Sequence, residues 1–464
     1  MQGGRRALSG GGRVMRRAAR SAWAALSLVA SLMSAEEAWG AQELGLNVHQ
    51  SVDLGLDVTA DVGLGWVRID LNWVDAQPDP GPPDFTFFDT LVDAALARGL
   101  QVLAVVGYGP AWASSGDGLG DGSHNDVPLP GSYEAFVTAV VQHFAGRVTH
   151  YELWNEPNLD VFFEGTPSDF TTHVLVPGAA ALHQSCSECK VVAPALASIG
   201  DEYDVWLDAS LAAAKDDIDI VSGHIYAGFH DDLTSDSFFH KLEEHRVVEV
   251  NGAVVFEGPL AFREVMAQHG VTAPFWLTEV GREAAPGDPS ALGEQRVLYR
   301  KVLEAMLSRP WWEATLFYEA FDNSDLFWGV AWPDAAAAMG YQPKPVMELL
   351  QKVTASSPAF GGDGFVCDDG LDNDGDDLVD YPEDPDCTTA LGASERSPSG
   401  GGAGGGGGGG GGDLGGAGGE AAAPDEVGCG CRLGPVPRAR PGWLVALVVG
   451  LVLRRRGRSG RERA

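Results

Sequence analysis

Two glutamates in distinctive sequence settings are the residues of this chain best suited to chemistry. Glu156 lies in the segment 154–158, which reads Trp-Asn-Glu-Pro-Asn, and Glu279 lies in the segment 277–281, which reads Leu-Thr-Glu-Val-Gly. A pair of carboxyl groups can cleave a glycosidic bond when one is protonated and donates to the leaving oxygen while the other is ionised and attacks the anomeric carbon. The two glutamates indicate this chemistry, provided that the fold brings them to one site.

The elements that must position these glutamates are strands that alternate with helices. Short runs rich in Val, Leu, Ile and aromatic residues are typical of buried strands, and they occupy residues 44–49, 66–70, 101–107, 150–154, 190–195, 218–224, 274–278 and 314–318. Amphipathic stretches such as 132–144 and 203–214 lie between them. Eight such units predict an α/β fold, a (β/α)₈ TIM barrel over residues 42–356. A doubly wound open sheet is the competing arrangement, but no phosphate-binding glycine loop follows the first strand.

Polar residues gather where the predicted strands end. In these barrels the chemistry takes place at the carboxyl ends of the strands. The residues at those positions are His49, Arg68, Asp70, Asn155, Glu156, His224, Tyr226, Glu279, Tyr318 and Glu319. So many polar side chains at equivalent positions predict one convergent site at the mouth of the barrel.

The two glutamate motifs resemble those of the clan A glycoside hydrolases, which carry Trp-Asn-Glu-Pro after strand four and Thr-Glu-x-Gly after strand seven. The closer resemblance is to families 39 and 5 of that clan, which are retaining enzymes on (β/α)₈ barrels. Supporting matches lie in the segments 45–49 (Gly-Leu-Asn-Val-His), 66–70 (Trp-Val-Arg-Ile-Asp), 223–226 (Gly-His-Ile-Tyr) and 343–345 (Pro-Lys-Pro).

The resemblance implies a role for each site residue and no cofactor for catalysis. Glu156 is expected to be the acid/base and Glu279 the nucleophile. Asn155 is expected to hydrogen-bond the 2-hydroxyl of the sugar, and Arg68 and Tyr226 to hold the nucleophile ionised and oriented. The remaining expected substrate contacts are His224, His49 and Tyr318.

One departure from the family pattern and several purely structural interpretations stand beside these roles. Many clan members carry a Trp sugar platform at the end of strand eight, whereas residues 316–320 here read Leu-Phe-Tyr-Glu-Ala and Trp328 comes later. Glu156 could be a helix-start carboxylate, Glu279 an ion-pair partner of Arg282, and Arg68 a buried structural cation. Glu152 is interpreted as structural.

The sequence thus favours a retaining β-glycosidase that acts on an oligo- or polysaccharide. The alternative from another class is a non-catalytic carbohydrate-binding surface protein on the same barrel, and an inverting or transglycosylating barrel is the alternative among enzymes. A binding protein needs no acid beside a nucleophile, so the glutamate pair favours the enzyme.

Charge and cysteine content narrow the possible partners. The formal net charge is −34, with basic residues concentrated at both ends of the chain, and so acidic a body would repel nucleic acid. The six cysteines form three close pairs, of which Cys186/Cys189 and Cys367/Cys387 are plausible disulfides in an exported protein. The first pair is expected to be a local surface disulfide or two inert thiols.

The remaining segments predict export and display. Residues 1–41 have the basic, apolar and small-residue order of a signal peptide. Residues 361–390 form an Asp-rich module in which Asp372, Asp374, Asp376 and Asp380 have the spacing of a calcium loop, an acidic spacer being the alternative. Residues 398–428 are a Gly-rich linker. Residues 429–464, with Cys, apolar and Arg-rich parts in order, resemble a MYXO-CTERM sorting tail. We expect an exported protein, at the cell surface or secreted, that is recognised by cell-envelope sorting machinery.

Overall fold

The computed structural model describes most of the chain between Glu43 and Phe360. The described ranges are 43–49, 52–116, 124–199, 202–226, 237–322 and 326–360, followed by 362, 364, 366–373, 378–380 and 387. The predicted signal peptide, Gly-rich linker and sorting tail, and the calcium-loop residues Asp374 and Asp376, lie outside these residues. Among the described helices, none has both the length and the apolar content needed to cross a bilayer.

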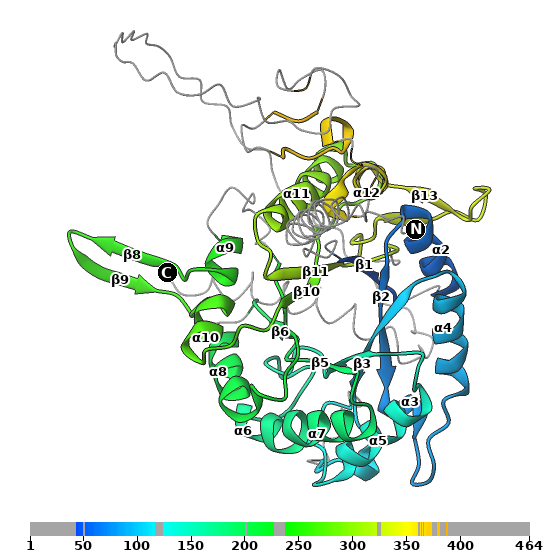
Figure 1. The fold of residues 1–464 in the computed structure, drawn as a ribbon, viewed down its shortest axis with the longest axis vertical. Helices are drawn as coiled ribbons and strands as arrows, with labels where there is room; N and C mark the ends of the chain where they lie inside the picture. The colour runs from blue at the N-terminus through cyan, green and yellow to red at the C-terminus, as the bar shows by residue number, and fades with distance from the viewer. Residues whose placement is uncertain are drawn as a thin grey trace, which may run out of the picture.

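A parallel sheet of nine short strands forms the centre of the fold (Figure 1). Its order is β5-β4-β3-β2-β1-β11-β10-β7-β6. The strands are β1 (Glu43–Asn47), β2 (Trp66–Asn72), β3 (Gln101–Gly107), β4 (His150–Leu153), β5 (Lys190–Val192), β6 (Leu196–Ala197), β7 (Val221–His224), β10 (Phe275–Val280) and β11 (Trp312–Phe317).

The two ends of this sheet meet. Val192 of β5 forms a parallel bridge to Ile220 beside β7, and Ala195 forms one to Asn155 beyond β4. The strands β5 and β6 are therefore two parts of one strand position, interrupted by the cis Ala193–Pro194 peptide. The sheet curls into an α/β barrel with eight strand positions, which confirms the predicted fold class for this part of the chain.

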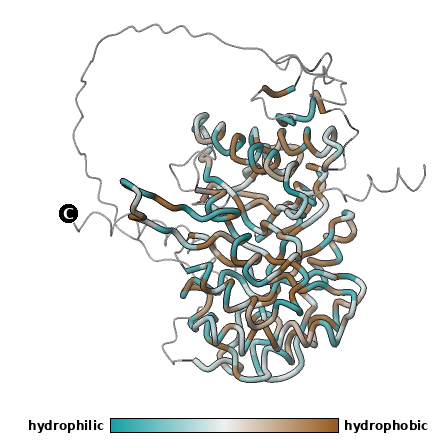
Figure 2. Tube along the Cα trace, turned by 60° about the vertical axis from the view of Figure 1, so that its left-hand side comes forward, coloured by the Kyte–Doolittle hydropathy of each residue, from teal (hydrophilic) through white to brown (hydrophobic). Residues whose placement is uncertain are grey.

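Helices surround the sheet, as the sequence pattern predicted. They are α2 (Val52–Val62), α3 (Trp73–Ala76), α4 (Thr86–Ala97), α5 (Ser132–His143), α6 (Pro167–Phe170), α7 (Val176–Ser185), α8 (Tyr203–Ala214), α9 (Ser237–Leu242), α10 (Phe262–Gln268), α11 (Pro289–Leu307) and α12 (Pro345–Ser356). The helices α6 and α7 are joined by a π-helical turn, Thr171–Leu175. A hairpin of β8 (Val247–Val250) and β9 (Ala253–Glu257) projects from the body (Figures 1 and 2).

The period of two along β2 explains how the barrel is filled. Trp66 packs inside the barrel with Leu103 and Trp276 in a small apolar cluster, while Val67 and Ile69 belong to the large core between sheet and helices. Alternate residues of a barrel strand point inward, so Arg68 follows Trp66 on the inner side. The apolar layer thus lies at one end of the barrel and the charged residues lie toward the other.

Both expected disulfides are present. Cys186 is bonded to Cys189, but the two residues are only 7% and 2% exposed, so the expectation of a surface disulfide is wrong in its location. The pair closes the turn after α7, where Cys189 packs against the strand connection near Val148.

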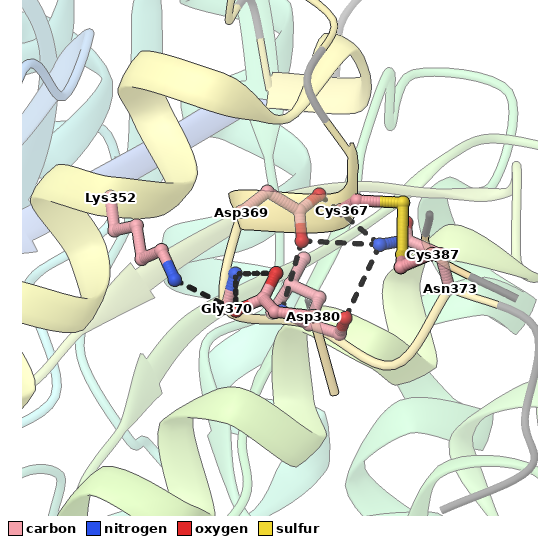
Figure 3. Close-up of a disulfide and its surroundings, with 8 residues drawn as sticks. Lys352, Cys367, Asp369, Gly370, Asn373, Asp380 and Cys387 are labelled. Atoms are coloured by element: carbon pink, nitrogen blue, oxygen red, sulfur yellow. Dashed lines mark hydrogen bonds and ion pairs between the residues drawn. A yellow bond between two sulfur atoms is a disulfide. The ribbon is translucent and has the colours of Figure 1, made fainter. Parts of the chain in front are cut away.

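The second disulfide, Cys367–Cys387, belongs to the Asp-rich module (Figure 3). Leu371 is fully buried in the same core cluster as the barrel residues. Lys352 of α12 lies 2.9 Å from an Asp368 oxygen and 2.7 Å from an Asp380 oxygen, and Asp380 also accepts a hydrogen bond from the Gly370 backbone N–H (Figure 3). The described part of the module is therefore packed on the outside of the barrel.

Gly281, directly after β10, tests how tightly the barrel mouth is packed. A Cβ atom there would clash with the backbone carbonyl oxygen of Tyr318. We expect Gly281→Ala to lower the free energy of unfolding by about 1–3 kcal/mol, as overpacking does. At Gly293, inside α11, a Cβ atom would meet no other atom within 4 Å, so Gly293→Ala should stabilise by up to about 1 kcal/mol through helix propensity. Urea unfolding of both variants measures this, and equal midpoints would contradict it.

Candidate active site

The segment after β4 adopts an uncommon backbone conformation. Trp154 and Glu156 have φ angles of +80° and +41°, in a region that costs non-glycine residues about 1–3 kcal/mol each and that persists only where the surroundings enforce it. The Trp154 N–H donates to the Val106 carbonyl at 3.0 Å and the Glu156 N–H donates to the Ala195 carbonyl at 2.8 Å. These hydrogen bonds to the strand positions on both sides fix the orientation of the backbone at Glu156.

Glu156 is a buried carboxyl with one engaged oxygen and one free oxygen. It is 1% exposed, and its Oε1 lies 2.8 Å from His224 Nδ1. Its Oε2 has no hydrogen-bond partner among the described residues. Burial, and then the negative charge of Glu279, raise the pKa of Glu156 well above its usual range. Glu156 is thus held protonated, with an oxygen available to a further group.

Glu279 lies across the barrel mouth in a different environment. Its Oε1 accepts a hydrogen bond from Arg68 Nη1 at 2.7 Å, and its Oε2 accepts one from the Tyr226 hydroxyl at 2.7 Å. Burial raises the pKa of Glu279, but the charge of Arg68 and the Tyr226 hydroxyl oppose that rise. Of the two carboxyls, Glu156 is therefore the one that keeps its proton and Glu279 the one that ionises first.

Arg68 is the centre of a buried polar network. Its Nε donates to Glu152 Oε2 at 2.6 Å, and its other nitrogens donate to Asn47 Oδ1 at 2.9 Å and Asn155 Oδ1 at 2.8 Å. Because Asn155 uses its oxygen in this way, its NH₂ group is the part left to donate elsewhere. Arg68 also forms the expected ion pair with Glu279.

Glu152 and Asn47 are network members that the sequence did not single out as site residues. Glu152 accepts hydrogen bonds from the Ser222 hydroxyl at 2.7 Å and the Thr278 hydroxyl at 2.9 Å, in addition to Arg68. Asn47 also donates to the Thr278 carbonyl at 2.9 Å. Two features of the sequence indicated them. Glu152 lies at an alternate position of its strand that points into the barrel, and Asn47 lies in the first strand.

His49 and Tyr318 lie at the same mouth. His49 Nδ1 is 3.0 Å from Asp70 Oδ2. Burial by itself would lower the pKa of His49, but Asp70 and then Glu319 and Glu279 raise it to about 9. The Tyr318 ring lies 5.5 Å from the His49 ring, and Tyr318 packs with Tyr226 and Trp328 in a small aromatic cluster. Trp328, whose position the sequence did not predict, thus packs against Tyr226, which is hydrogen-bonded to Glu279.

All eight predicted catalytic and substrate-binding residues therefore meet in one place. The predicted calcium ligands belong to the Asp-rich module outside the barrel, as expected; Asp380 contacts Lys352 there, and Asp374 and Asp376 lie outside the described residues. Residues that reasoning from sequence missed, besides Asn47 and Glu152, are Tyr108 and Trp328. Tyr108 is buried after β3, and its hydroxyl has no hydrogen-bond partner among the described residues.

Glu156, His224 and Glu279 stand close enough together to be ligands of one divalent ion. One oxygen or nitrogen atom from each lies within 4.8 Å of the other two. The Glu279 oxygens are already hydrogen-bonded to Arg68 and Tyr226, and His224 Nδ1 to Glu156. A cluster whose carboxylate is paired with a guanidinium suits proton transfer and nucleophilic attack better than it suits a second cation.

Comparisons with known proteins find similarity to glycosidases. No protein-family model matches the chain. The chain is 28% identical over 153 residues to a β-xylosidase of Geobacillus stearothermophilus, covering 31% of this chain and 30% of that protein. It is 26% identical over 246 residues to a β-xylosidase of Caldicellulosiruptor saccharolyticus, covering 48% and 46%. The matches thus span less than half the length of these relatives.

A solved structure shares the fold. A family 39 glycoside hydrolase from Bacteroides cellulosilyticus WH2 superposes with a TM-score of 0.50 at 17% identity, covering 67% of this chain and 62% of that one. At this identity the likeness concerns the fold alone, and it supports the α/β barrel. The chain is therefore similar in sequence to β-xylosidases and similar in fold to a family 39 glycoside hydrolase.

Glu319, at the end of β11, makes stability depend on pH. Burial raises the pKa of Glu319 to about 8, with His49 and Lys344 opposing the rise and Glu279 and Asp322 adding to it. The folded state therefore holds a proton that the unfolded chain releases near pH 4.5, so this contribution to stability is complete at low pH and is lost as the pH rises toward 8.

We expect Glu319→Gln, which is neutral at every pH, to become more stable relative to the wild type as the pH rises from 5 to 9. Urea unfolding at pH 5, 7 and 9 gives the comparison, with Glu134→Gln on the exposed face of α5 as the control. Parallel pH curves for Glu319→Gln and the wild type would show that Glu319 keeps an ordinary pKa.

Proposed function

We propose that this chain is a glycosidase that hydrolyses a β-linked glycan, with Glu156 as acid/base and Glu279 as nucleophile. The observation that carries the proposal is the unlike environment of two buried carboxyls at one barrel mouth. Among the described residues the one hydrogen-bond partner of the Glu156 carboxyl is His224, which is neutral because burial holds the pKa of His224 well below its usual range. Glu279 is bonded to the guanidinium of Arg68. The similarity to β-xylosidases makes a β-xyloside the first substrate to test.

The proposed reaction has two steps. In the first, Glu279 attacks the anomeric carbon while Glu156 donates its proton from Oε2 to the glycosidic oxygen, and the leaving alcohol departs. In the second, the ionised Glu156 takes a proton from water, which attacks the anomeric carbon and releases Glu279. Each step inverts the anomeric centre, so the product keeps the β configuration.

The short spacing of the two carboxyls supports this retaining course. One carboxyl oxygen of Glu156 and one of Glu279 lie within 4.8 Å of each other. Retaining enzymes hold their carboxyls about 5–5.5 Å apart, whereas inverting enzymes need about 6.5–9.5 Å to admit a water molecule. Asn155, with its NH₂ group free to donate, suits the 2-hydroxyl of the bound sugar.

Replacing each glutamate should separate the two roles. Glu279→Ala should abolish turnover, because it removes the carboxylate proposed to attack the anomeric carbon. Glu156→Ala should slow substrates with poor leaving groups by about 10²–10⁴-fold and should spare the first step for activated aryl β-glycosides. Azide should then restore turnover of these substrates by attacking the glycosyl-enzyme, giving a β-glycosyl azide.

Proton NMR of the first-formed sugar checks the stereochemistry, and Glu134→Gln on the exposed side of α5 is the matched control. An α-anomer appearing first from a β-linked substrate would rule out the retaining course. A chain that binds the glycan without hydrolysing any aryl β-glycoside would instead favour a carbohydrate-binding protein.

We further propose that the protein is exported and is displayed at the cell surface or secreted. Two disulfides suit an oxidising compartment, and the order of the terminal segments suits a signal peptide and a sorting tail. Calcium binding by Asp372, Asp374, Asp376 and Asp380 is part of the same proposal. In the structure the Lys352 ammonium group forms an ion pair with Asp380, so a calcium ion bound by Asp380 would have to displace Lys352 or share the carboxylate with it.

Mass spectrometry of the mature protein from its native host tests the sorting tail. We expect peptides of the barrel to be recovered from the envelope or the medium, and peptides after about residue 431 to be missing. Recovery of the intact Arg-rich end on an exported protein would contradict processing, and recovery of the N-terminal 40 residues from the same sample would contradict export.

A further inference from the structure

Two buried polar atoms at the junction of β1 and β11 have no role in the network around Arg68. They are Oε1 of Glu319 and Nε2 of His49, and neither has a hydrogen-bond partner among the described residues. Glu319 is 2% exposed. A buried polar group left unpaired costs about 1–3 kcal/mol. A pair of such groups at a barrel mouth, beside a proposed nucleophile, points to a bound group that satisfies both.

We propose that Glu319 and His49 together bind one hydroxyl group of the sugar that Glu279 attacks, which makes Glu319 a specificity-determining residue of the site. This inference rests on the proposed glycosidase function. It assigns the contact to a hydroxyl other than the 2-hydroxyl, which is proposed above to bind Asn155.

The two side chains come from neighbouring strand ends. The strands β1 and β11 pair in parallel up to Leu46 and Phe317, and the Ala320 N–H extends the pairing by donating to the Asn47 carbonyl at 3.0 Å. The charges of His49 and Glu319 each shift the pKa of the other, and Glu279 acts on both. All three groups therefore lie near one another at the mouth.

The nearby cation is not available to Glu319. Lys344 is fully buried, and its Nζ contacts Asp322 Oδ1 at 2.6 Å, the Phe327 carbonyl at 3.0 Å and the Ala284 carbonyl at 3.1 Å. An ammonium group has three N–H donors, and these three acceptors account for them. A role for Glu319 in holding Lys344 is therefore already filled by Asp322.

The chemistry of the two groups matches a hydroxyl. Asp70 holds the Nδ1 side of His49, so the charged imidazole presents Nε2–H as a donor to the hydroxyl oxygen. The Glu319 carboxyl can accept the hydroxyl hydrogen or, when protonated, donate to the same oxygen. A carboxylate on the sugar would meet Glu279 and Asp70 close by, so repulsion disfavours an acidic sugar.

Deoxy substrates separate a hydroxyl contact from a merely structural role. We would compare kcat/KM for the best-cleaved 4-nitrophenyl β-glycoside, starting with the β-xyloside, and for its 3-deoxy and 4-deoxy analogues. The wild type should lose about 10–100-fold on the analogue that lacks the bound hydroxyl. The kcat/KM of Glu319→Leu on the parent glycoside should fall by a similar factor. Removing the bound hydroxyl from the substrate should then lower the kcat/KM of this variant almost no further, whereas removing the other hydroxyl should lower it by the same ratio as in the wild type.

Glu319→Gln keeps the shape and part of the hydrogen bonding of Glu319, so its kcat/KM on the parent glycoside should lie between those of the wild type and Glu319→Leu. If Glu319→Leu does not fold, Glu319→Gln serves in its place and should be less sensitive than the wild type to loss of the bound hydroxyl. His49→Gln should show the same insensitivity to the missing hydroxyl. Glu134→Gln should behave as the wild type.

The outcomes distinguish this inference from the proposed function. If the wild type hydrolyses the glycosides but the Glu319 variants lose the same factor on the parent and on both analogues, Glu319 acts through the structure and the inference is overturned. If the wild type hydrolyses none of the aryl β-glycosides, the proposed glycosidase function is itself contradicted.

Discussion

The buried guanidinium of Arg68 is the group on which the arrangement of the barrel mouth depends. It is fully buried and bonded to Glu152, Asn47, Asn155 and Glu279. A buried cation is tolerated only where its charge and its donors are all matched. Side chains from β1, β2, β4 and β10 must therefore converge on one point, and the barrel is the arrangement that allows strands so far apart in sequence to do so.

Two carboxylates share the charge of Arg68, with different consequences. Glu152, below the mouth, is fully satisfied by Arg68, Ser222 and Thr278. Glu279, at the mouth, is held by Arg68 and Tyr226. In the described part of the chain no lysine or arginine is hydrogen-bonded to Glu156, and burial and the charge of Glu279 raise its pKa, so its proton is retained. One cation thus makes the two carboxyls at the mouth chemically different.

The backbone around the site supports the same division. The turn that carries Glu156 holds two residues at positive φ, fixed by hydrogen bonds to the strand positions on either side. Glu279 instead lies within strand β10, whose pairing with β7 shifts register between Leu277 and Glu279. The small Gly281 after the strand allows the close approach of the Tyr318 backbone. The proposed proton donor is thus placed by an irregular turn and the proposed nucleophile by a strand, and Tyr318 and Glu319 follow the neighbouring strand β11.

The sequence by itself determined the barrel, the glutamate pair and the residues at the strand ends, because these depend on local signals: runs of apolar residues, helical periodicity and short motifs. The tertiary structure alone decided the rest. Glu152 became a full member of the network through Arg68, 84 positions away, and Asn47 through Thr278, 231 positions away.

The same reason explains the division of strand five into β5 and β6, the burial of the Cys186–Cys189 bond, and the position of Trp328 beside Tyr226. Each depends on which distant segments pack together when the sheet closes, and no local pattern encodes that closure. The unpaired oxygens of Glu156 and Glu319 also follow from it, because only the closed mouth shows which buried groups have found a partner and which have not.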